Sequence, residues 1–225
     1  MIFILTGAGL SAESGLGTFR DEGGLWTRYD LSEVATPEGY ARDPVKVLEF
    51  YDARRANAAG AEPNAAHRAL ARLSQEAGAM LVTQNVDTLL EAAGAKGVVH
   101  MHGQLDRALC NKCRRRWKAP ERMCPFDACP HCGAQAVRPD VVWFGEMPYA
   151  MDEIEDGLAR ADLFVAVGTS GTVYPAAGLA EAARAAGVDT LEINLEPTGG
   201  AFDRGIYGPA SQVVPEWVDG LLIEA

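Results

Sequence analysis

Long apolar runs and an excess of basic residues are both missing from this chain of 225 residues. No apolar stretch approaches the ~20 residues that a membrane-spanning helix requires. Lysine and arginine number 20 against 31 aspartates and glutamates, which gives a formal net charge of −11. Direct binding to nucleic acid or to an anionic membrane is disfavoured, because both need clustered positive charge. Met1 leads into a strand-like segment without a basic leader, so we expect a cytoplasmic protein.

Cysteine is absent from most of the chain. All five cysteines lie between Cys110 and Cys132, whereas a disulfide framework would distribute them and would not leave an odd one. The two Cys-x-x-Cys pairs, Cys110 with Cys113 and Cys129 with Cys132, have the spacing of a four-thiolate zinc ribbon. Four protein ligands leave no open position, so the predicted zinc ion is structural. We expect the remaining Cys124 to be a free thiol, or at most an occasional competitor for the metal.

Strand-like and helix-like segments alternate along the rest of the chain. Short apolar runs predict strands at Ile2–Leu5, Met80–Thr83, Val98–Val99, Leu163–Val167 and Leu191–Leu195, with Gln212–Val214 as a candidate sixth. Alanine-rich stretches with helical spacing lie at Asn64–Gln75, Thr88–Ala93, Met151–Arg160 and Pro175–Ala186. This alternation predicts an α/β fold with a mostly parallel sheet that is covered by helices on both faces.

Two segments interrupt the alternation. Trp26–Ala61 has no clear strand, and Leu105–Pro139 contains all the cysteines. We expect both to be insertions that form a smaller second lobe. The predicted division assigns residues 1–28, 77–104 and 140–225 to the large domain, 29–76 to a helical module and 105–139 to a zinc ribbon.

Four predicted strand ends carry small or polar residues: Gly7–Gly9, Gln84–Asp87, Gly168–Ser170, and Asn194 with Glu196. Ligands of parallel sheets bind beyond the carboxyl ends of the strands, so we expect these segments to converge on one crevice. The first segment fits the pattern Gly-x-Gly-x-x-Ala, whose turn presents backbone N–H groups to a phosphate. The fit to a dinucleotide fingerprint is partial, because the acidic residue about 20 positions further on is missing.

Two histidines, His100 and His102, follow the predicted strand Val98–Val99. A neutral imidazole at the mouth of the crevice would be a general base near pH 7. A hydrogen-bonded structural histidine is the commoner alternative, and the residues alone do not choose between the two. Asn85 and Asp87 are similarly either crevice ligands or helix N-caps.

Tyr51 and Arg54 are three residues apart on a predicted helix and share the face of Val47 and Leu48. In one interpretation, Arg54 ends an apolar stripe at its solvated side. In the other, the phenol and the guanidinium point into a pocket for an anionic group, which suits the bidentate hydrogen bonding of arginine.

Together these motifs resemble those of the sirtuins, the NAD-dependent protein lysine deacylases, over nearly the whole chain. The matching blocks follow in family order: Gly7–Ser11 with Ser14–Leu16 and Phe19–Arg20, Gln84–Asp87, His102–Gly103, the two cysteine pairs, Val141–Glu146, Gly168–Ser170 and Asn194–Glu196. The resemblance implies a Rossmann-type NAD-binding domain, with a smaller lobe made of a zinc ribbon and a helical module. It also implies that NAD is consumed: the acyl oxygen attacks the ribose at C1′, nicotinamide leaves, and the products are free lysine and 2′-O-acyl-ADP-ribose.

The resemblance assigns roles to the matching residues. It makes His102 the catalytic base, His100 structural, and Asn85 the residue that positions the ribose and a water molecule. It implies NAD contacts for Gly7, Ala8, Gly9, Ser11, Glu13, Phe19, Arg20, Trp26, Gln84, Asn85, Asp87, Gly168, Thr169, Ser170, Asn194, Glu196 and Ala210. It implies that the substrate binds as an added strand along Val142, Phe144, Gly145 and Glu146.

The Tyr51-x-x-Arg54 pair matches the sirtuin subclass that removes succinyl and malonyl groups. The partners implied are acylated-lysine proteins, bound as extended peptides by a monomeric enzyme. One alternative is a protein mono-ADP-ribosyltransferase that uses the same NAD residues. A second is a non-catalytic NAD-sensing module, against which Asn85, Asp87 and His102 argue together.

Overall fold

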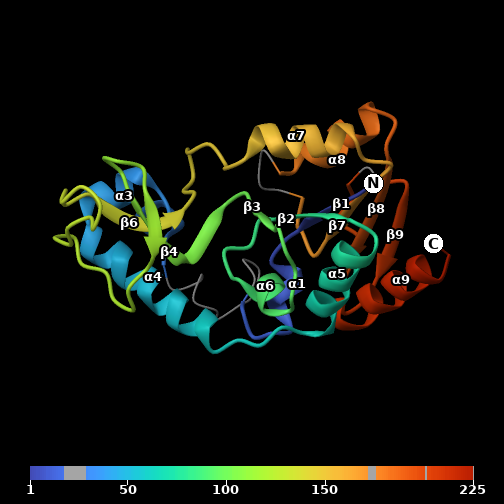
Figure 1. Ribbon diagram of the computed structural model, residues 1–225, viewed down its shortest axis with the longest axis horizontal. Coiled ribbons are helices and arrows are strands. Elements are labelled where there is room, and N and C mark those ends of the chain that lie inside the picture. The colour runs from blue at the N-terminus through green and yellow to red at the C-terminus, as the bar shows by residue number, and fades with distance from the viewer. Residues whose placement is uncertain (18–28, 172–175, 201, 225) are drawn as a thin grey trace.

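The structure is a computed structural model that describes residues 1–17, 29–171, 176–200 and 202–224. It contains a larger lobe on a six-stranded sheet and a smaller lobe on a three-stranded sheet (Figure 1). Within the described ranges, no helix combines the length and the apolar character needed to cross a membrane. The α/β class with a second, smaller lobe is therefore confirmed.

The large sheet has the strand order β3-β2-β1-β7-β8-β9, and each neighbouring pair is parallel. Its strands are β1 (Ile2–Thr6), β2 (Met80–Thr83), β3 (Val99–His100), β7 (Leu163–Val167), β8 (Asp189–Asn194) and β9 (Arg204–Tyr207). The chain adds strands on one side of β1 and then on the other, which is the doubly wound Rossmann order. The switch point lies between β1 and β7, where this fold binds its ligands.

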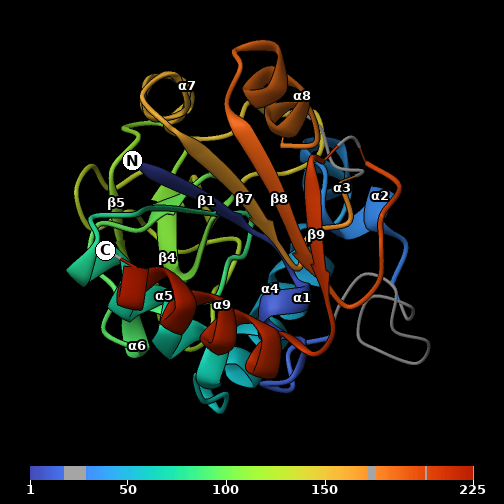
Figure 2. The same ribbon diagram turned by 90° about the vertical axis from the view of Figure 1, so that its right-hand side faces the viewer.

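Helices cover both faces of the large sheet (Figure 2). On one face lie α1 (Gly9–Ala12), α5 (Ala65–Glu76), α6 (Leu89–Ala92) and α9 (Ala210–Glu224); on the other lie α7 (Met151–Ala159) and α8 (Gly178–Ala185). Successive residues of a strand point to opposite faces. Ile4 accordingly packs in the core beneath α5 and α9, whereas Phe3 and Leu5 pack beneath α7 and α8. Burial on both faces explains why β1 and β7 are almost continuously apolar.

One expectation about the strands is corrected. Gln212–Val214 is not a strand but part of α9, because Val214 and Val218, four residues apart, are the fully buried positions. The sixth strand is instead β9, an edge strand with exposed residues. Helix α5 packs against α9 and the large sheet.

The small lobe combines helices with an antiparallel sheet of order β5-β4-β6. Its elements are α2 (Leu31–Val34), α3 (Pro37–Arg42), α4 (Pro44–Ala59), β4 (Gly103–Cys110), β5 (Arg116–Lys118) and β6 (Val137–Val141). Helix α4 begins at Pro44, which needs no N–H partner there, after an N-cap Asp43 whose side chain accepts from Lys46 N–H. Its Phe50 and Tyr51 pack on β4, β6 and Trp143, while Leu48 packs beside the cysteine pairs.

Candidate active site and zinc centre

The four cysteines predicted to bind zinc lie together. The Sγ atoms of Cys110, Cys113, Cys129 and Cys132 are all within 4.8 Å of one another. The Cys110–Cys132 and Cys113–Cys129 Sγ distances are both 3.7 Å, and a zinc tetrahedron with bonds of about 2.3 Å has edges of about 3.8 Å. The cluster therefore fits a closed, structural zinc site. Cys124 is exposed and lies outside this group.

The glycine loop after β1 lies directly against the loop after β7. Gly7 N–H donates to Val167 O at 2.9 Å, and Gly9 N–H donates to Gly168 O at 2.8 Å. A Cβ on Gly7 would be 2.8 Å from Gly168 O, and one on Gly9 would be 2.8 Å from Gly168 Cα. The glycines are needed because two backbones touch at the switch point. The N–H groups of Gly7 and Gly9 are occupied by this contact.

The predicted strand-end segments are joined by side-chain amides. Asn85 Nδ2 donates to Gly7 O at 3.0 Å, Gln84 Nε2 to Thr169 Oγ1 at 2.9 Å, and Asn194 Nδ2 to Thr169 O at 2.8 Å. The loops after β1, β2, β7 and β8 thus meet at one edge of the sheet. Ser170 continues the β7 loop, and Glu196 is exposed just after β8.

Glu13 and Ala210 lie where α1 and α9 approach each other. The Glu13 carboxylate accepts from Ser211 N–H and from Ser211 Oγ, both at 2.8 Å. Ala210 is the first residue of α9. The carboxylate of Glu13 therefore satisfies a backbone N–H at the N-terminus of this helix.

Ser11 and Asp87 belong to a buried polar chain that also contains His67. Ser11 Oγ donates to Asp87 Oδ2 at 3.0 Å and contacts His67 Nε2 at 3.3 Å. Because His67 Nδ1 accepts from Asn64 N–H, its Nε2 carries the hydrogen and donates to Ser11. Burial lowers the pKa of His67 to about 4, so it is neutral. Sequence reasoning missed His67; the Asn64-x-x-His67 capping box at the start of α5 is the signal that marks it.

Asp87 combines both interpretations considered for it. Its Oδ1 accepts from Leu89 N–H at 3.1 Å, as a residue that caps the start of α6 would. Its other oxygen is held by Ser11 in the crevice. Burial raises the pKa of Asp87, while the hydrogen bonds from Leu89 and Ser11 oppose that rise.

The two histidines after β3 have different surroundings. His100 contacts two acceptors, Glu91 Oε1 at 2.7 Å and Asn85 O at 3.2 Å, so both ring nitrogens are engaged. His102 Nδ1 lies 3.1 Å from Gln84 O, which only accepts, so Nδ1 carries the hydrogen. Among the described residues, His102 Nε2 has no hydrogen-bond partner, and burial lowers the pKa of this imidazole. His102 is therefore the neutral histidine with an open lone pair.

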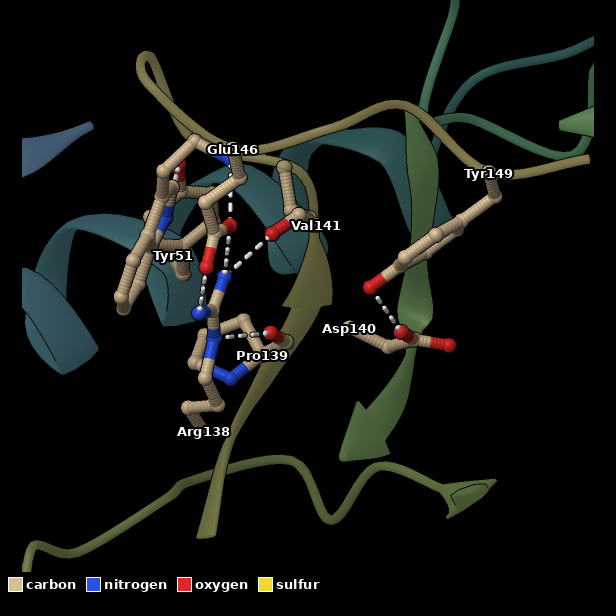
Figure 3. Close-up of polar contacts among 8 residues, drawn as sticks. Tyr51, Arg138, Pro139, Asp140, Val141, Glu146 and Tyr149 are labelled. Atoms are coloured by element: carbon tan, nitrogen blue, oxygen red, sulfur yellow. Dashed lines mark hydrogen bonds and ion pairs between the residues drawn. The ribbon is translucent and has the colours of Figure 1, made fainter. Parts of the chain in front are cut away.

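The segment after β6 is bonded to both lobes. Val142 N–H donates to His102 O at 2.9 Å, and Phe144 N–H donates to Ala35 O at 2.9 Å. Trp143 is buried, while the Phe144 side chain is 47% exposed and Gly145 has a φ of +88°. Figure 3 shows the Glu146 carboxylate turned back onto Arg138. The segment therefore passes beside His102 at Val142 and then turns at Phe144–Gly145, with the Trp143 side chain buried and the Phe144 side chain exposed.

Tyr51 and Arg54 lie on the α4 face that packs on the small sheet. The Tyr51 hydroxyl accepts from Trp143 Nε1 at 3.0 Å, and the Arg54 guanidinium carbon is 5.6 Å from the Tyr51 ring centroid. Burial lowers the pKa of Arg54, and the neighbouring Tyr51 and Asp87 oppose this shift. Tyr51 is fully buried and Arg54 is half-buried. The predicted NAD contacts Phe19, Arg20 and Trp26 lie outside the described residues.

These features define a class: a doubly wound enzyme domain whose switch point faces a neutral histidine, joined to a zinc-bearing second lobe. The sequence profile of the Sir2 family matches residues 7–175. The NAD-dependent protein deacylase of Caulobacter vibrioides is 57% identical over 98% of this chain and 96% of its own length. The NAD-dependent protein deacylase of Escherichia coli is 51% identical over 98% of this chain and 82% of its own length.

Solved structures agree with this relationship. A Sir2 homologue in complex with NAD matches 99% of this chain and 89% of its own with a TM-score of 0.88 and 38% identity. A mutant Sir2 homologue in complex with ADP-ribose matches 99% of this chain and 92% of its own with a TM-score of 0.89. The chain therefore belongs to the Sir2 family of NAD-dependent enzymes.

Proposed function

We propose that this protein is an NAD-dependent protein lysine deacylase that releases nicotinamide, 2′-O-acyl-ADP-ribose and free lysine. The names of its relatives support the deacylase class and do not favour ADP-ribosylation of proteins. When bound, NAD would supply the ribose from which nicotinamide departs and which accepts the acyl group. The observation that carries the proposal is the open Nε2 of His102 at the edge where the NAD loops meet.

His102 has the properties of a general base. Gln84 O holds the hydrogen on Nδ1, so the lone pair of Nε2 faces away from that bond. Burial lowers the pKa of His102, which keeps the imidazole neutral at pH 7 and able to take a proton from a ribose hydroxyl. Asn85 is oriented by Gly7 O and Ser11 Oγ, a fixed position from which it would hold the ribose and a water molecule.

An extended peptide fits along Val142–Gly145. The N–H groups of Val142 and Phe144 are already used by His102 O and Ala35 O. In the described part of the chain, the carbonyl oxygens of Val142 and Phe144 and the N–H of Gly145 make no hydrogen bond. These groups are the ones that would pair with a substrate backbone as an added strand. The exposed Phe144 and Met147 provide apolar contact for its side chains.

We further propose a preference for acidic acyl groups, recognised by Tyr51 and Arg54. Because Trp143 Nε1 donates to the Tyr51 oxygen, the phenolic hydrogen of Tyr51 is directed elsewhere and would donate to a carboxylate. The charge on half-buried Arg54 is disfavoured by burial, and a succinyl or malonyl carboxylate would offset that penalty. An acetyl group has no carboxylate and would gain nothing from either contact.

A panel of lysine peptides tests the activity. Acetyl-, succinyl-, malonyl- and longer acyl-lysine peptides of one sequence are incubated with and without NAD, and the products are identified by mass spectrometry. We expect free lysine, nicotinamide and acyl-ADP-ribose, and only with NAD. An ADP-ribosylated peptide as the main product would overturn the proposed reaction.

The role of His102 is tested in the same assay. We expect His102→Ala to retain the circular dichroism spectrum and NAD binding of the wild type, and to lose turnover. Turnover close to that of the wild type would mean that another group is the base.

A further inference from the structure

Arg138 is a buried cation on β6 that reaches the turn beyond the end of the strand. It is only 3% exposed. Its Nη1 and Nη2 donate to the two Glu146 carboxylate oxygens at 2.6 and 2.8 Å, and Nη2 also donates to Val141 O at 2.6 Å (Figure 3). Its Nε donates to Pro139 O at 3.3 Å. A bidentate arginine–carboxylate pair of this kind fixes orientation as well as distance.

Glu146 closes the turn that this arginine holds. One of its carboxylate oxygens accepts from Trp143 N–H at 2.9 Å, and its own N–H donates to Trp143 O at 3.0 Å. Gly145 adopts a φ of +88° between them, a conformation that favours glycine. Burial alone would raise the pKa of Glu146, but the bonds from Arg138 and Trp143 lower it, so the carboxylate stays ionised. The side chain faces its own turn and is not available to a peptide.

Trp143 connects this turn to helix α4. The Arg138 guanidinium carbon lies 3.4 Å from the centroid of the Trp143 ring. On its other side the indole Nε1 donates to the Tyr51 hydroxyl at 3.0 Å. Figure 3 shows Tyr51 behind the Arg138–Glu146 pair, whereas Asp140 and Tyr149 form a separate contact on the opposite side of β6. The buried Arg138–Glu146 ion pair therefore fixes the position of the Trp143 indole, and the indole in turn fixes the position of the Tyr51 hydroxyl.

We propose that Arg138 and Glu146 are positioning residues for the acylated peptide. They hold the backbone of Val142–Gly145, including its turn, in place beside His102, and through Trp143 they fix the position of Tyr51 for the acyl group. The proposal rests on the proposed function, in which this segment binds substrate and Tyr51 recognises its acyl chain. In this proposal the Glu146 side chain supports the substrate-binding segment from behind, in addition to the backbone contact predicted for this residue.

A double-mutant cycle on peptide binding tests the proposal. Glu146→Gln, Arg138→Met and the double variant are compared by calorimetric titration of a succinyl-lysine peptide without NAD, and by KM values for peptide and for NAD. We expect the peptide Kd to rise roughly tenfold or more in each single variant, because a charged bidentate contact is lost. We expect the double variant to be no worse than the singles, since both remove one interaction. The KM for NAD should change less than about twofold.

Asp140→Asn is the matched control. Asp140 is also a buried carboxylate on β6, and it bonds to Tyr149 at 2.9 Å and Arg116 at 2.8 Å, not to Trp143. We expect its substitution to lower Tm without raising the peptide Kd. Arg138→Lys keeps the charge but not the bidentate contact, so it should restore Tm more than it restores peptide affinity.

Three results would overturn the positioning role. These are an unchanged peptide Kd in Glu146→Gln, equal losses of peptide and NAD affinity, and a peptide Kd in Asp140→Asn that rises as far as in Glu146→Gln. If Arg138→Met does not fold, the isosteric Glu146→Gln still decides, because its side chain retains an acceptor for Trp143 N–H. A wild type that binds the peptide without deacylating it would refute the proposed function instead.

Discussion

Replacing Arg54 by methionine separates recognition of the acyl group from catalysis. The change removes a guanidinium that lies 5.7 and 5.6 Å from the Phe50 and Tyr51 ring centroids, and it keeps an apolar side chain of similar reach. A hydrogen bond to a charged group contributes about 1.5–3 kcal/mol. For one bond to a succinyl carboxylate, this corresponds to a roughly 10- to 150-fold loss of kcat/KM. An acetyl peptide lacks the carboxylate and should change by less than about threefold.

The measurement is the ratio of kcat/KM for succinyl- and acetyl-lysine peptides of one sequence. Arg54→Lys should give an intermediate ratio, because it keeps the charge and loses the planar fork. Arg55→Met is the matched control: Arg55 donates to Leu105 O at 2.9 Å and pairs with Asp52. We expect it to lower Tm and leave the ratio unchanged. Equal losses on both peptides in Arg54→Met would refute the reasoning.

Tyr51→Phe is a less selective test of the same pocket. It leaves the buried Trp143 Nε1–H without its acceptor, which costs about 1–3 kcal/mol of folding free energy. A loss of activity in that variant would therefore mix acyl recognition with small-lobe stability, and Arg54→Met avoids this mixture.

Three further predictions concern stability and metal content. His67 has a pKa of about 4 in the folded protein, against an ordinary value of 6.5. The unfolded chain therefore takes up a proton first, so the free energy of unfolding is highest above pH 6.5 and falls as the pH drops toward 4. The loss is about 2 kcal/mol at pH 5; urea unfolding at pH 7 and 5 measures it, and an equal pH dependence in His67→Gln would contradict it. Cys129→Ser should lose zinc by metal analysis and lower Tm, whereas Cys124→Ser should retain it; zinc loss in both would refute this cluster. Gly9→Ala should lower stability by about 1–3 kcal/mol and weaken NAD binding in calorimetry, and a wild-type Tm would exclude the close contact with Gly168.

The sequence predicts the parts of this protein that depend on local pattern. The buried strands β1, β2 and β7 are short apolar runs followed by small or polar residues, and the four cysteines of the zinc site follow from spacing alone. The sequence fails where packing overrides pattern. The run Gln212–Val214 has the composition of a strand, but it lies in α9, where Val214 and Val218 share one buried helix face. Strand β9 has little apolar alternation, because it is an exposed edge.

The contacts that shape the site are less predictable, because they join residues far apart in the chain. Trp143 and Tyr51 are 92 positions apart, and Ser11 and Asp87 are 76 apart. The different hydrogen-bond environments of His100 and His102 are also visible only in the structure. Only the positions of Glu91 and Asn85 O show that both nitrogens of His100 are engaged.

The hydrogen bond from Val142 N–H to His102 O ties the proposed substrate-binding segment to the backbone of the proposed base. In the proposed reaction, this hydrogen bond sets the distance between the bound peptide and His102. Because it joins two backbone groups, a side-chain substitution does not remove either of its atoms. In the proposed function, the acyl group is recognised elsewhere, by Tyr51 and Arg54 on α4. Under this proposal, substitutions at Arg54 change which acyl chain is accepted while the reacting centre keeps its alignment. Insertions or deletions between Val142 and Tyr149, by contrast, would disturb every substrate equally, so this connection should not tolerate changes in length.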